Sequence, residues 1–282
     1  MKIDLRLDKE VQNYAVFGNP VSHSKSPLIH SLFARQTNIH LHYQAIEVPV
    51  DAFPVYLNAF AAQSGKGLNI TVPFKQAAYN ACQVLSNAAN KAQSVNTISC
   101  DDSGQNHGDT TDGNGLLNDL TINNDVVIKD RSVLVLGAGG SVRAILEPLC
   151  NAQPQTLVIA NRTLSKAEQL AEQFSDLNNI EVSAFNELDQ WQFDLIINAT
   201  SSSLSGELPP LPDSILKPGA CCYDLMYAET DTVFMQWARA QGAAKVLDGI
   251  GMLVEQAAES FLIWHGVKPE TVPVMQALRK PQ

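Results

Sequence analysis

The stretch "SVLVLGAGGSVRAILEPL", residues 132–149, decides the fold of the second half of the chain. A mostly apolar run, a group of glycines and an amphipathic segment follow one another, which predicts a strand, a tight turn and a helix over 140–152. Gly137 permits the turn, Gly139 lets the backbone approach a pyrophosphate, and free N–H groups at the helix start face that anion. Val142 replaces the third glycine of the dinucleotide fingerprint, so an ordinary glycine-rich turn is the alternative. A further strand follows the helix, and this context favours a nucleotide site.

The end of that next strand, "TLVIANRT" (156–163), indicates which nucleotide is bound. NAD-binding proteins usually carry a carboxylate here for the ribose hydroxyls, whereas this strand ends in Asn161, Arg162 and Thr163. A guanidinium can fork onto a phosphate and a threonine can donate to it, so the sequence favours NADP. The alternative is that Arg162 is an ordinary surface residue and that Thr163 only caps the helix predicted over 164–174.

Strands and helices alternate along the whole chain, which predicts an α/β protein with mostly parallel sheets. A polar, glycine-rich break over 101–115 marks the best domain boundary. The strands are expected at 14–18, 42–48, 67–73, 94–99, 132–137, 156–163, 193–200 and 221–227. The helices are expected at 27–36, 51–63, 74–92, 140–152, 164–174 and 232–242, with a long helix after 248–251 and another near 269–280.

Composition narrows the class of protein. The 282 residues suggest two domains, and the net charge of −10 argues against nonspecific binding to nucleic acid or to an anionic membrane. No apolar run approaches the ~18 residues of a membrane span, and the charged first residues show no secretory signal. The five cysteines do not have the spacing of a metal site, so no bound metal is expected. Their odd number also argues against a disulfide framework, so we expect a cytoplasmic location.

Two charged residues suit carbonyl reduction. Lys75 ends "NITVPFK" and Asp112 lies in "GDTTDG", at the domain boundary where a cleft is expected. An ammonium can polarise a C=O group and supply a proton, while a carboxylate orients the lysine and keeps it charged. The alternative is a surface ion pair of little energetic value, and spacing alone favours that alternative.

The loop "GNPVSHSKSPLIH" (18–30) carries three serines near the start of the chain. Ser26 followed by Pro27 is typical of a helix N-cap and its first residue. Ser24 has no structural role that the sequence reveals, so its hydroxyl is the better candidate for a polar ligand.

Six segments together resemble the shikimate dehydrogenase family, from about residue 13 to residue 270. They are "GNPVSHSKSP", "NITVPFK", "GDTTDG", "GAGG", "NRT" and "DGIGMLVEQAA", in the family's order. The resemblance implies reversible NADPH-dependent reduction of 3-dehydroshikimate to shikimate in aromatic amino-acid biosynthesis. It also implies a substrate-binding domain formed by 1–111 with 249–282, to which the C-terminal helices return, and a Rossmann-like NADP-binding domain over 112–248. The expected partner is the small-molecule substrate alone, for a monomer or a homodimer.

The resemblance also implies roles for individual residues. Lys75 and Asp112 would be the catalytic pair. The substrate carboxylate would be bound by Ser24 and Ser26 with Tyr227 nearby, and the ring hydroxyls by Thr71, Asn96 and Gln256. The pyrophosphate would lie on Gly137, Ala138, Gly139, Gly140 and Ser141, the 2′-phosphate on Asn161, Arg162 and Thr163, and the nicotinamide near Leu225 and Gly249. Thr110, Ser141 and Val142 depart from the family's usual residues without removing any of these assignments.

Two alternatives stay open. A quinate/shikimate dehydrogenase of broader substrate and cofactor use would be expected to carry an acidic residue where this chain has "NRT". A non-catalytic, ligand-sensing homologue would be expected to lack the lysine–aspartate pair.

Overall fold

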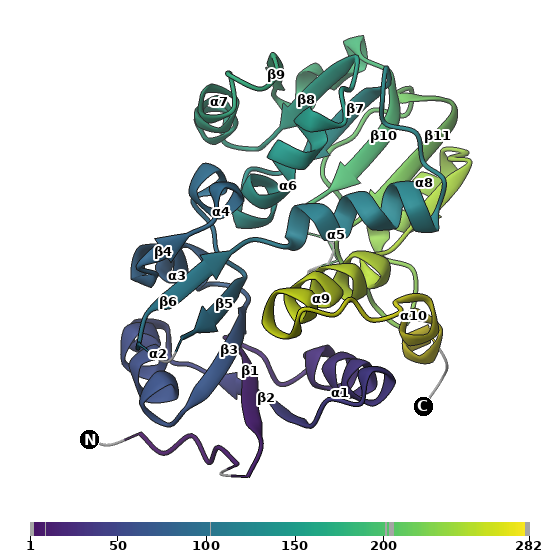
Figure 1. The fold of residues 1–282 in the computed structure, drawn as a ribbon. Coiled ribbons are helices and arrows are strands. Elements are labelled where there is room, and N and C mark those ends of the chain that lie inside the picture. The colour runs from purple at the N-terminus through teal and green to yellow at the C-terminus, as the bar shows by residue number, and fades with distance from the viewer. Residues whose placement is uncertain (1–2, 9, 102, 201, 203–205, 280–282) are drawn as a thin grey trace. The chain divides into compact units, whose positions relative to one another are not determined.

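The computed structural model describes residues 3–8, 10–101, 103–200, 202 and 206–279 (Figure 1). Contacts divide the chain into two compact units. Unit 1 is residues 1–115 with 254–282, and unit 2 is residues 116–253. Both junctions fall inside helices, α5 (Asp112–Asn118) and α9 (Ile250–His265). The sequence puts the junctions slightly earlier, at 111/112 and 248/249.

Unit 2 contains a six-stranded sheet in which every pairing is parallel, in the order β12-β11-β10-β7-β8-β9. Its strands are β7 (Ser132–Leu136), β8 (Thr156–Ala160), β9 (Ile180–Ser183), β10 (Phe193–Asn198), β11 (Leu216–Asp224) and β12 (Lys245–Leu247). The order reverses between β7 and β10, and ligands of open α/β sheets bind at such a point, beyond the carboxyl ends of the strands. The Rossmann-like prediction for this half is confirmed.

Side chains of β7 alternate between two apolar cores, as a strand buried on both faces requires. Val133 and Val135 pack in one core with residues of α6 and α7, whereas Leu134 and Leu136 pack in the other with residues of α8. The helical elements of unit 2 are η2 (Asp119–Asn123), α6 (Gly140–Asn151), α7 (Leu164–Gln173), η3 (Phe185–Gln190) and α8 (Val233–Ala240).

Unit 1 contains a six-stranded mixed sheet in the order β2-β1-β3-β5-β6-β4. Its strands are β1 (Gln12–Gly18), β2 (Leu41–Glu47), β3 (Gly65–Ile70), β4 (Val84–Leu85), β5 (Thr97–Cys100) and β6 (Asn106–Asp109). β5 runs antiparallel to both β3 and β6, and the other three pairings are parallel. The sheet is therefore mostly parallel, as predicted, with one reversed strand.

The helices of unit 1 cover both faces of this sheet. One core holds Phe17, Phe53, Phe60 and Phe74, and a smaller cluster holds Tyr14 and Tyr43 with Trp264 of α9. The helical elements are α1 (Ser26–Thr37), η1 (Val50–Ala52), α2 (Phe53–Ala62), α3 (Lys75–Ala81), α4 (Asn87–Ala92), α9 and α10 (Val272–Arg279). The C-terminal helix was expected to reach residue 280, which lies outside the described residues.

Two expectations for unit 1 are wrong in detail. The single helix expected over 74–92 is two short helices with β4 between them, because Ser86 caps α4 by accepting the Ala89 N–H. The break expected over 101–115 contains β6 and the start of α5. Asp101 closes the β5–β6 hairpin, since its Oδ1 accepts the N–H groups of Ser103 and Gln105.

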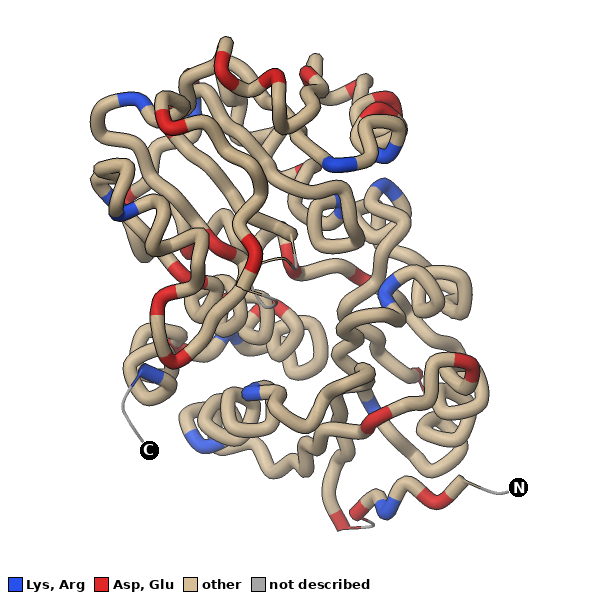
Figure 2. The backbone as a smooth tube through the Cα atoms, turned by 180° about the vertical axis from the view of Figure 1, so that it is seen from behind, with Lys and Arg blue, Asp and Glu red and all other residues tan. Residues whose placement is uncertain are grey.

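Charges are dispersed along the chain. Figure 2 shows Lys and Arg positions scattered among Asp and Glu rather than gathered on one element. Among the helices of the described residues, none is long and apolar enough to cross a membrane. The same residues contain no group of three or more His, Cys, Asp or Glu side chains that could hold a metal ion.

Candidate active site

Lys75 and Asp112 form an ion pair in unit 1. Lys75 is the first residue of α3 and Asp112 the first residue of α5, so each begins the helix that follows a strand of the sheet. The Lys75 Nζ lies 2.5 Å from Asp112 Oδ2, and the two side chains are only 15% and 7% exposed. A pair so shielded from solvent is not the weak surface ion pair that spacing alone favoured.

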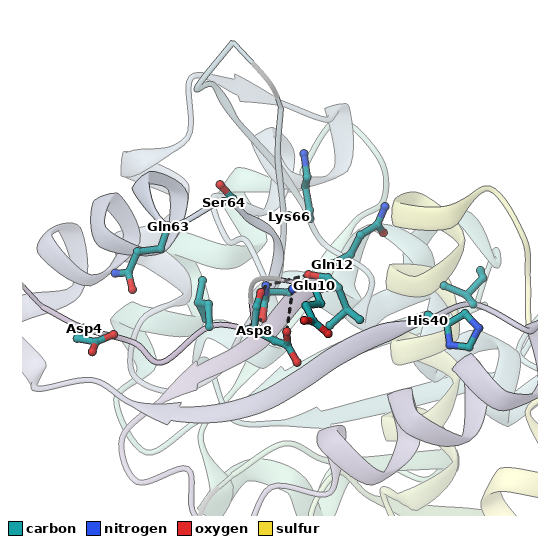
Figure 3. A pocket seen from close by; sticks show the side chains of 12 residues that line it. Asp4, Asp8, Glu10, Gln12, His40, Gln63, Ser64 and Lys66 are labelled. Atoms are coloured by element: carbon teal, nitrogen blue, oxygen red, sulfur yellow. Dashed lines mark hydrogen bonds between the residues drawn. The ribbon is translucent and has the colours of Figure 1, made fainter.

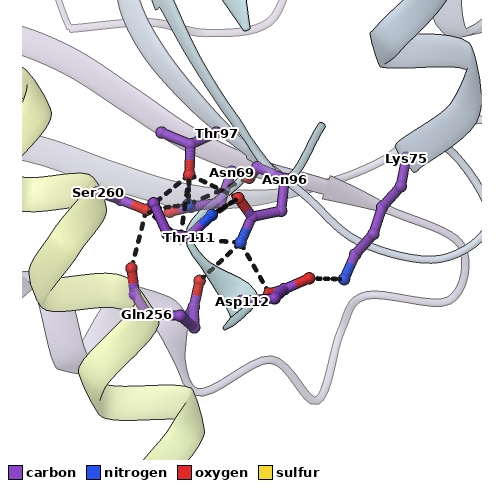
Figure 4. A network of polar contacts seen from close by, with 8 residues as sticks. All are labelled: Asn69, Lys75, Asn96, Thr97, Thr111, Asp112, Gln256 and Ser260. Atoms are coloured by element: carbon purple, nitrogen blue, oxygen red, sulfur yellow. Dashed lines mark hydrogen bonds and ion pairs between the residues drawn. The ribbon is translucent and has the colours of Figure 1, made fainter. Parts of the chain in front are cut away.

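Asn96 connects this pair to the C-terminal segment (Figure 4). Its Nδ2 donates to Asp112 Oδ1 at 2.8 Å and to Gln256 Oε1 at 3.2 Å. The backbone N–H of Thr111 donates to Asn96 Oδ1 at 2.8 Å, which fixes which way the amide points. Asp112 therefore accepts from Asn96 on one oxygen and from Lys75 on the other.

The serine loop differs from its expected local structure. Lys25, not Ser26, occupies the N-cap of α1, and Ser26 is the buried first residue of the helix. Ser24 also has a structural role, because its Oγ accepts the Ser26 N–H at 3.3 Å. The Tyr43 hydroxyl donates to Asn69 Oδ1 at 2.7 Å, and the Ser26 side chain lies near enough to this hydroxyl to act on its pKa. Desolvation raises the pKa of Tyr43, so this hydroxyl keeps its proton.

The structure thus joins four of the predicted substrate and catalytic residues directly, namely Lys75, Asp112, Asn96 and Gln256. Ser26 lies beside the same network, near the Tyr43 hydroxyl that donates to Asn69. Thr71 follows β3, and its methyl group covers Gly18, where an added Cβ would lie 2.4 Å from Thr71 Cγ2. Tyr227 belongs to unit 2, and burial raises the pKa of its hydroxyl.

The turn after β7 has the form that a pyrophosphate site needs. Gly137 has a φ of 110°, a left-handed conformation that other residues rarely adopt. Gly139 is the N-cap of α6 and Gly140 its first residue, no side chain caps the helix, and a Cβ added at either glycine would have open space around it. Ala138 and Ser141 flank them, both partly exposed. Val142 is buried in the apolar core and leaves the turn intact.

The turn after β8 carries polar side chains that are open to a ligand. Thr163 occupies the N-cap position of α7, but its side chain makes no capping hydrogen bond. The Asn161 Nδ2 donates to the Thr163 carbonyl at 2.8 Å and closes the turn. Arg162 is exposed and forms no ion pair with any residue that the structure describes. Its guanidinium and the Thr163 hydroxyl are therefore available to an anion.

Leu225 and Gly249 approach each other closely in unit 2. The Leu225 N–H donates to the Asn198 carbonyl at 2.9 Å, and the Gly249 N–H donates to the Met226 carbonyl at 3.1 Å. A Cβ added at Gly249 would lie 2.1 Å from the Leu225 carbonyl oxygen. Only glycine allows the two backbone segments to meet here.

Sequence reasoning missed a group of buried polar side chains that extends the network around the Lys75–Asp112 pair. They are Tyr43, Asn69, Thr97, Thr111 and Ser260. The available signal was polar residues within the predicted strands, Asn69 in "GLNITVP" and Thr97 in "SVNTIS". Ser260 gave no such signal beyond lying one helical turn after Gln256.

A separate pocket of about 740 Å³ lies near the start of β1 and contains none of the predicted site residues. Among the described residues that line it are the carboxylates of Asp4, Asp8 and Glu10 and the ammonium of Lys66 (Figure 3). Asp4 and Asp8 each accept a nearby backbone N–H, as carboxylates in turns do. Neither Lys75 nor Asp112 lines this pocket, so it is separate from the candidate active site.

Family models match three stretches of the chain. The shikimate dehydrogenase substrate binding domain matches residues 16–98, the shikimate / quinate 5-dehydrogenase model matches 121–205, and the shikimate 5'-dehydrogenase C-terminal domain matches 249–279.

Relatives are similar along nearly the full length. The shikimate dehydrogenase (NADP(+)) of Cellvibrio japonicus is 54% identical over 267 residues, which cover 95% of this chain and 96% of that protein. The enzyme of the same name from Alkalilimnicola ehrlichii is 52% identical, with 94% and 98% covered. A crystal structure of shikimate 5-dehydrogenase from Thermus thermophilus, in complex with NADP(H) and shikimate, has a TM-score of 0.85 at 30% identity, with 95% and 98% covered.

Proposed function

This chain belongs to the shikimate dehydrogenase family, and we propose that it catalyses the reversible NADPH-dependent reduction of 3-dehydroshikimate to shikimate. It is an oxidoreductase of the shikimate pathway of aromatic amino-acid biosynthesis, acting in the cytoplasm as a monomer or a homodimer. The observation that supports this most strongly is the shielded Lys75–Asp112 pair in hydrogen-bond contact with Asn96.

Lys75 is the residue that moves the proton. Its ammonium has three N–H donors, one of which is used by Asp112 Oδ2, so the others can face the substrate carbonyl oxygen. In the direction of reduction it donates a hydrogen bond to that oxygen and then transfers a proton to it, as the carbonyl carbon becomes the alcohol carbon. Asp112 accepts on both oxygens, and its role is to orient Lys75 and hold it charged until the transfer.

The substrate binds through hydroxyl and amide groups of unit 1. Asn96, Gln256 and Thr71 bind the ring hydroxyls, and Ser24 and Ser26 bind the carboxylate, with Tyr227 nearby. A site of this kind rejects analogues that lack a hydroxyl, because its own buried polar groups would then lose their partners.

NADP fits the residues of unit 2. Gly137, Ala138, Gly139, Gly140 and Ser141 would hold the pyrophosphate, because the uncapped N-terminus of α6 presents free N–H groups above two glycines that leave the space open. Asn161, Arg162 and Thr163 would hold the 2′-phosphate, and Leu225 and Gly249 would contact the nicotinamide through their backbone. When bound, the reduced cofactor supplies the hydride. The domain division expected from the sequence, 1–111 with 249–282 for the substrate and 112–248 for NADP, differs from the two units by a few residues at each junction, so that Asp112 falls in unit 1 and Gly249 in unit 2.

The test is a spectrophotometric assay of four combinations, shikimate or quinate with NADP or NAD. We expect shikimate with NADP to have by far the highest kcat/KM. The matching family model is described for quinate as well as shikimate, so quinate is the one substrate class worth testing beside it. Absence of turnover in all four combinations would refute the proposed function, and a preference for quinate or for NAD would move the chain to the broader enzyme class.

A further inference from the structure

Ser260 lies on α9, one helical turn after Gln256, with no exposed surface. Its Oγ lies 2.7 Å from Thr97 Oγ1, 2.9 Å from Asn69 Nδ2 and 3.1 Å from the Gln256 carbonyl (Figure 4). It also lies 3.3 Å from Thr111 Oγ1. One buried hydroxyl therefore meets polar atoms from β3, β5, the turn before α5 and its own helix.

The donor and the acceptor can be assigned for the main hydrogen bonds of this network. The Thr111 N–H fixes Asn96 Oδ1 as an acceptor, and Thr97 Oγ1 donates to that oxygen at 3.0 Å. The Thr97 hydroxyl has then used its only proton, so it accepts from Ser260 at 2.7 Å. Ser260 also donates to the Gln256 carbonyl at 3.1 Å, so its single proton is shared between these two acceptors in a three-centre hydrogen bond. Ser260 in turn accepts from Asn69, whose own Oδ1 accepts the Tyr43 hydroxyl.

This chain of hydrogen bonds leads from Ser260 through Thr97 to Asn96, the residue that is proposed to bind the substrate. Asn96 receives hydrogen bonds on its oxygen and donates from its nitrogen to Asp112 and Gln256. Aligned donors polarise one another, and a fully satisfied buried network holds its members in one geometry. The Thr111 N–H fixes which way the Asn96 amide points, and Ser260 supports that position through Thr97, although Ser260 and Asn96 make no direct contact among the hydrogen bonds that the structure gives.

We propose that Ser260 is a positioning residue for the substrate's ring hydroxyls, acting through Thr97 on Asn96 and through its own helix on Gln256. The inference rests on the proposed function, since it assumes that Asn96 and Gln256 bind shikimate. Ser260 itself touches neither substrate nor cofactor. Loss of its hydroxyl removes the shortest hydrogen bond of Thr97 Oγ1 and the nearest acceptor of Asn69 Nδ2, which leaves the 3.4 Å contact between Asn69 Nδ2 and Thr97 Oγ1 in their place, and both side chains are buried.

The test compares Ser260→Ala and Ser260→Cys with the unchanged enzyme. Cysteine keeps the volume but is a weak hydrogen-bond donor, so it separates a lost hydrogen bond from a cavity. We expect both variants to raise the shikimate KM about tenfold, the factor that corresponds to 1.4 kcal/mol. The Kd for shikimate by titration calorimetry without cofactor should rise by a similar factor, and the KM for NADP should not change.

A matched control is Ser94→Ala, a buried serine of the same unit whose Oγ has no hydrogen-bond partner among the described residues. We expect it to leave the shikimate KM unchanged. Thr97→Val should raise the shikimate KM, and the double variant with Ser260→Ala should lose little more than either single variant, because both break the same chain of hydrogen bonds.

The outcomes separate the two proposals. If the unchanged enzyme turns over shikimate while the Ser260 variants lose only melting temperature, with the KM and Kd for shikimate unaltered, Ser260 is merely structural and the inference is wrong. If the unchanged enzyme neither binds nor oxidises shikimate, the proposed function fails and the inference fails with it.

Discussion

The stability of unit 1 should fall in mild acid because of His30. The ring has no exposed surface and stacks on Tyr43, with centroids 4.2 Å apart and an interplanar angle of 7°. Neither ring nitrogen has a hydrogen-bond partner among the described residues, and Phe33, Phe261 and Trp264 surround it. Desolvation lowers the pKa of His30 from 6.5 to about 3, and the nearby Asn69 amide opposes this only in part.

The sign and size of the effect follow from these two values. The unfolded chain binds a proton at this side chain below a pKa of 6.5, and the folded chain does so only near 3, so stability falls as the pH falls through this window. Between about pH 7.5 and about pH 5.0 the loss from this one group is about 2 kcal/mol of the free energy of unfolding. Protonation of carboxylates also lowers the free energy of unfolding in acid. The measurement must therefore separate the contribution of His30 from theirs.

The assay is urea unfolding at both pH values, followed by the fluorescence of Trp264 in unit 1. Replacing Trp191 and Trp237 of unit 2 by Phe makes this the sole tryptophan signal and removes two indole N–H groups that have no partner among the described residues. In that background His30→Phe keeps an aromatic ring but cannot titrate. We expect its loss between the two pH values to be smaller by about 2 kcal/mol. Equal losses with and without His30 would refute the reasoning.

Three further changes test the site. Lys75→Ala should lower kcat about 10²- to 10⁴-fold, with a smaller change in the shikimate KM, because it removes the proton donor; near-normal kcat in steady-state assays would contradict that role. Arg162→Ala should raise the KM for NADPH about 10- to 100-fold by removing charge-assisted hydrogen bonds, and leave that for NADH unchanged; equal changes would exclude a 2′-phosphate contact. Gly115→Ala would place a Cβ 2.7 Å from the Gln256 backbone nitrogen, so the shikimate KM should rise while that for NADP stays constant; an unaltered shikimate KM would show that Gln256 need not stay where it is.

The nucleotide-binding half was predictable because its signals are local. The strands expected in this half, β7, β8, β10 and the end of β11, are largely apolar, as strands buried on both faces must be. The turn glycines stand directly between a strand and a helix, at 137–140. Short-range pattern and the handedness of parallel connections therefore predicted these four strands. The two short edge strands, β9 and β12, were not predicted, because four and three residues carry too little pattern.

Several details of unit 1 could not be predicted, because they depend on contacts between distant parts of the chain or on a single capping residue. β6 reads "NHGD", which has low strand propensity, and it is a strand because β5 and β4 pair with its two edges. The split of the helix expected over 74–92 depends on one serine cap. The sequence distinguished Ser24 from Ser26 only by predicting that Ser26 is the N-cap of the first helix. In the structure, Lys25 occupies that N-cap.

The polar network explains why the site could be predicted only in part. Asn96 and Gln256 are 160 residues apart and Ser260 and Asn69 are 191 residues apart, so no local pattern links them. Most buried polar groups are hydrogen-bonded, and here the partners come from β3, β5, α5 and α9 together. A chain ending before α9 would keep the residues of the Lys75–Asp112 pair but would remove Ser260 from Asn69 and Thr97, and Gln256 from Asn96. If Asn96 binds the substrate as proposed, α9 therefore supports the substrate site as well as packing on the sheet through Trp264.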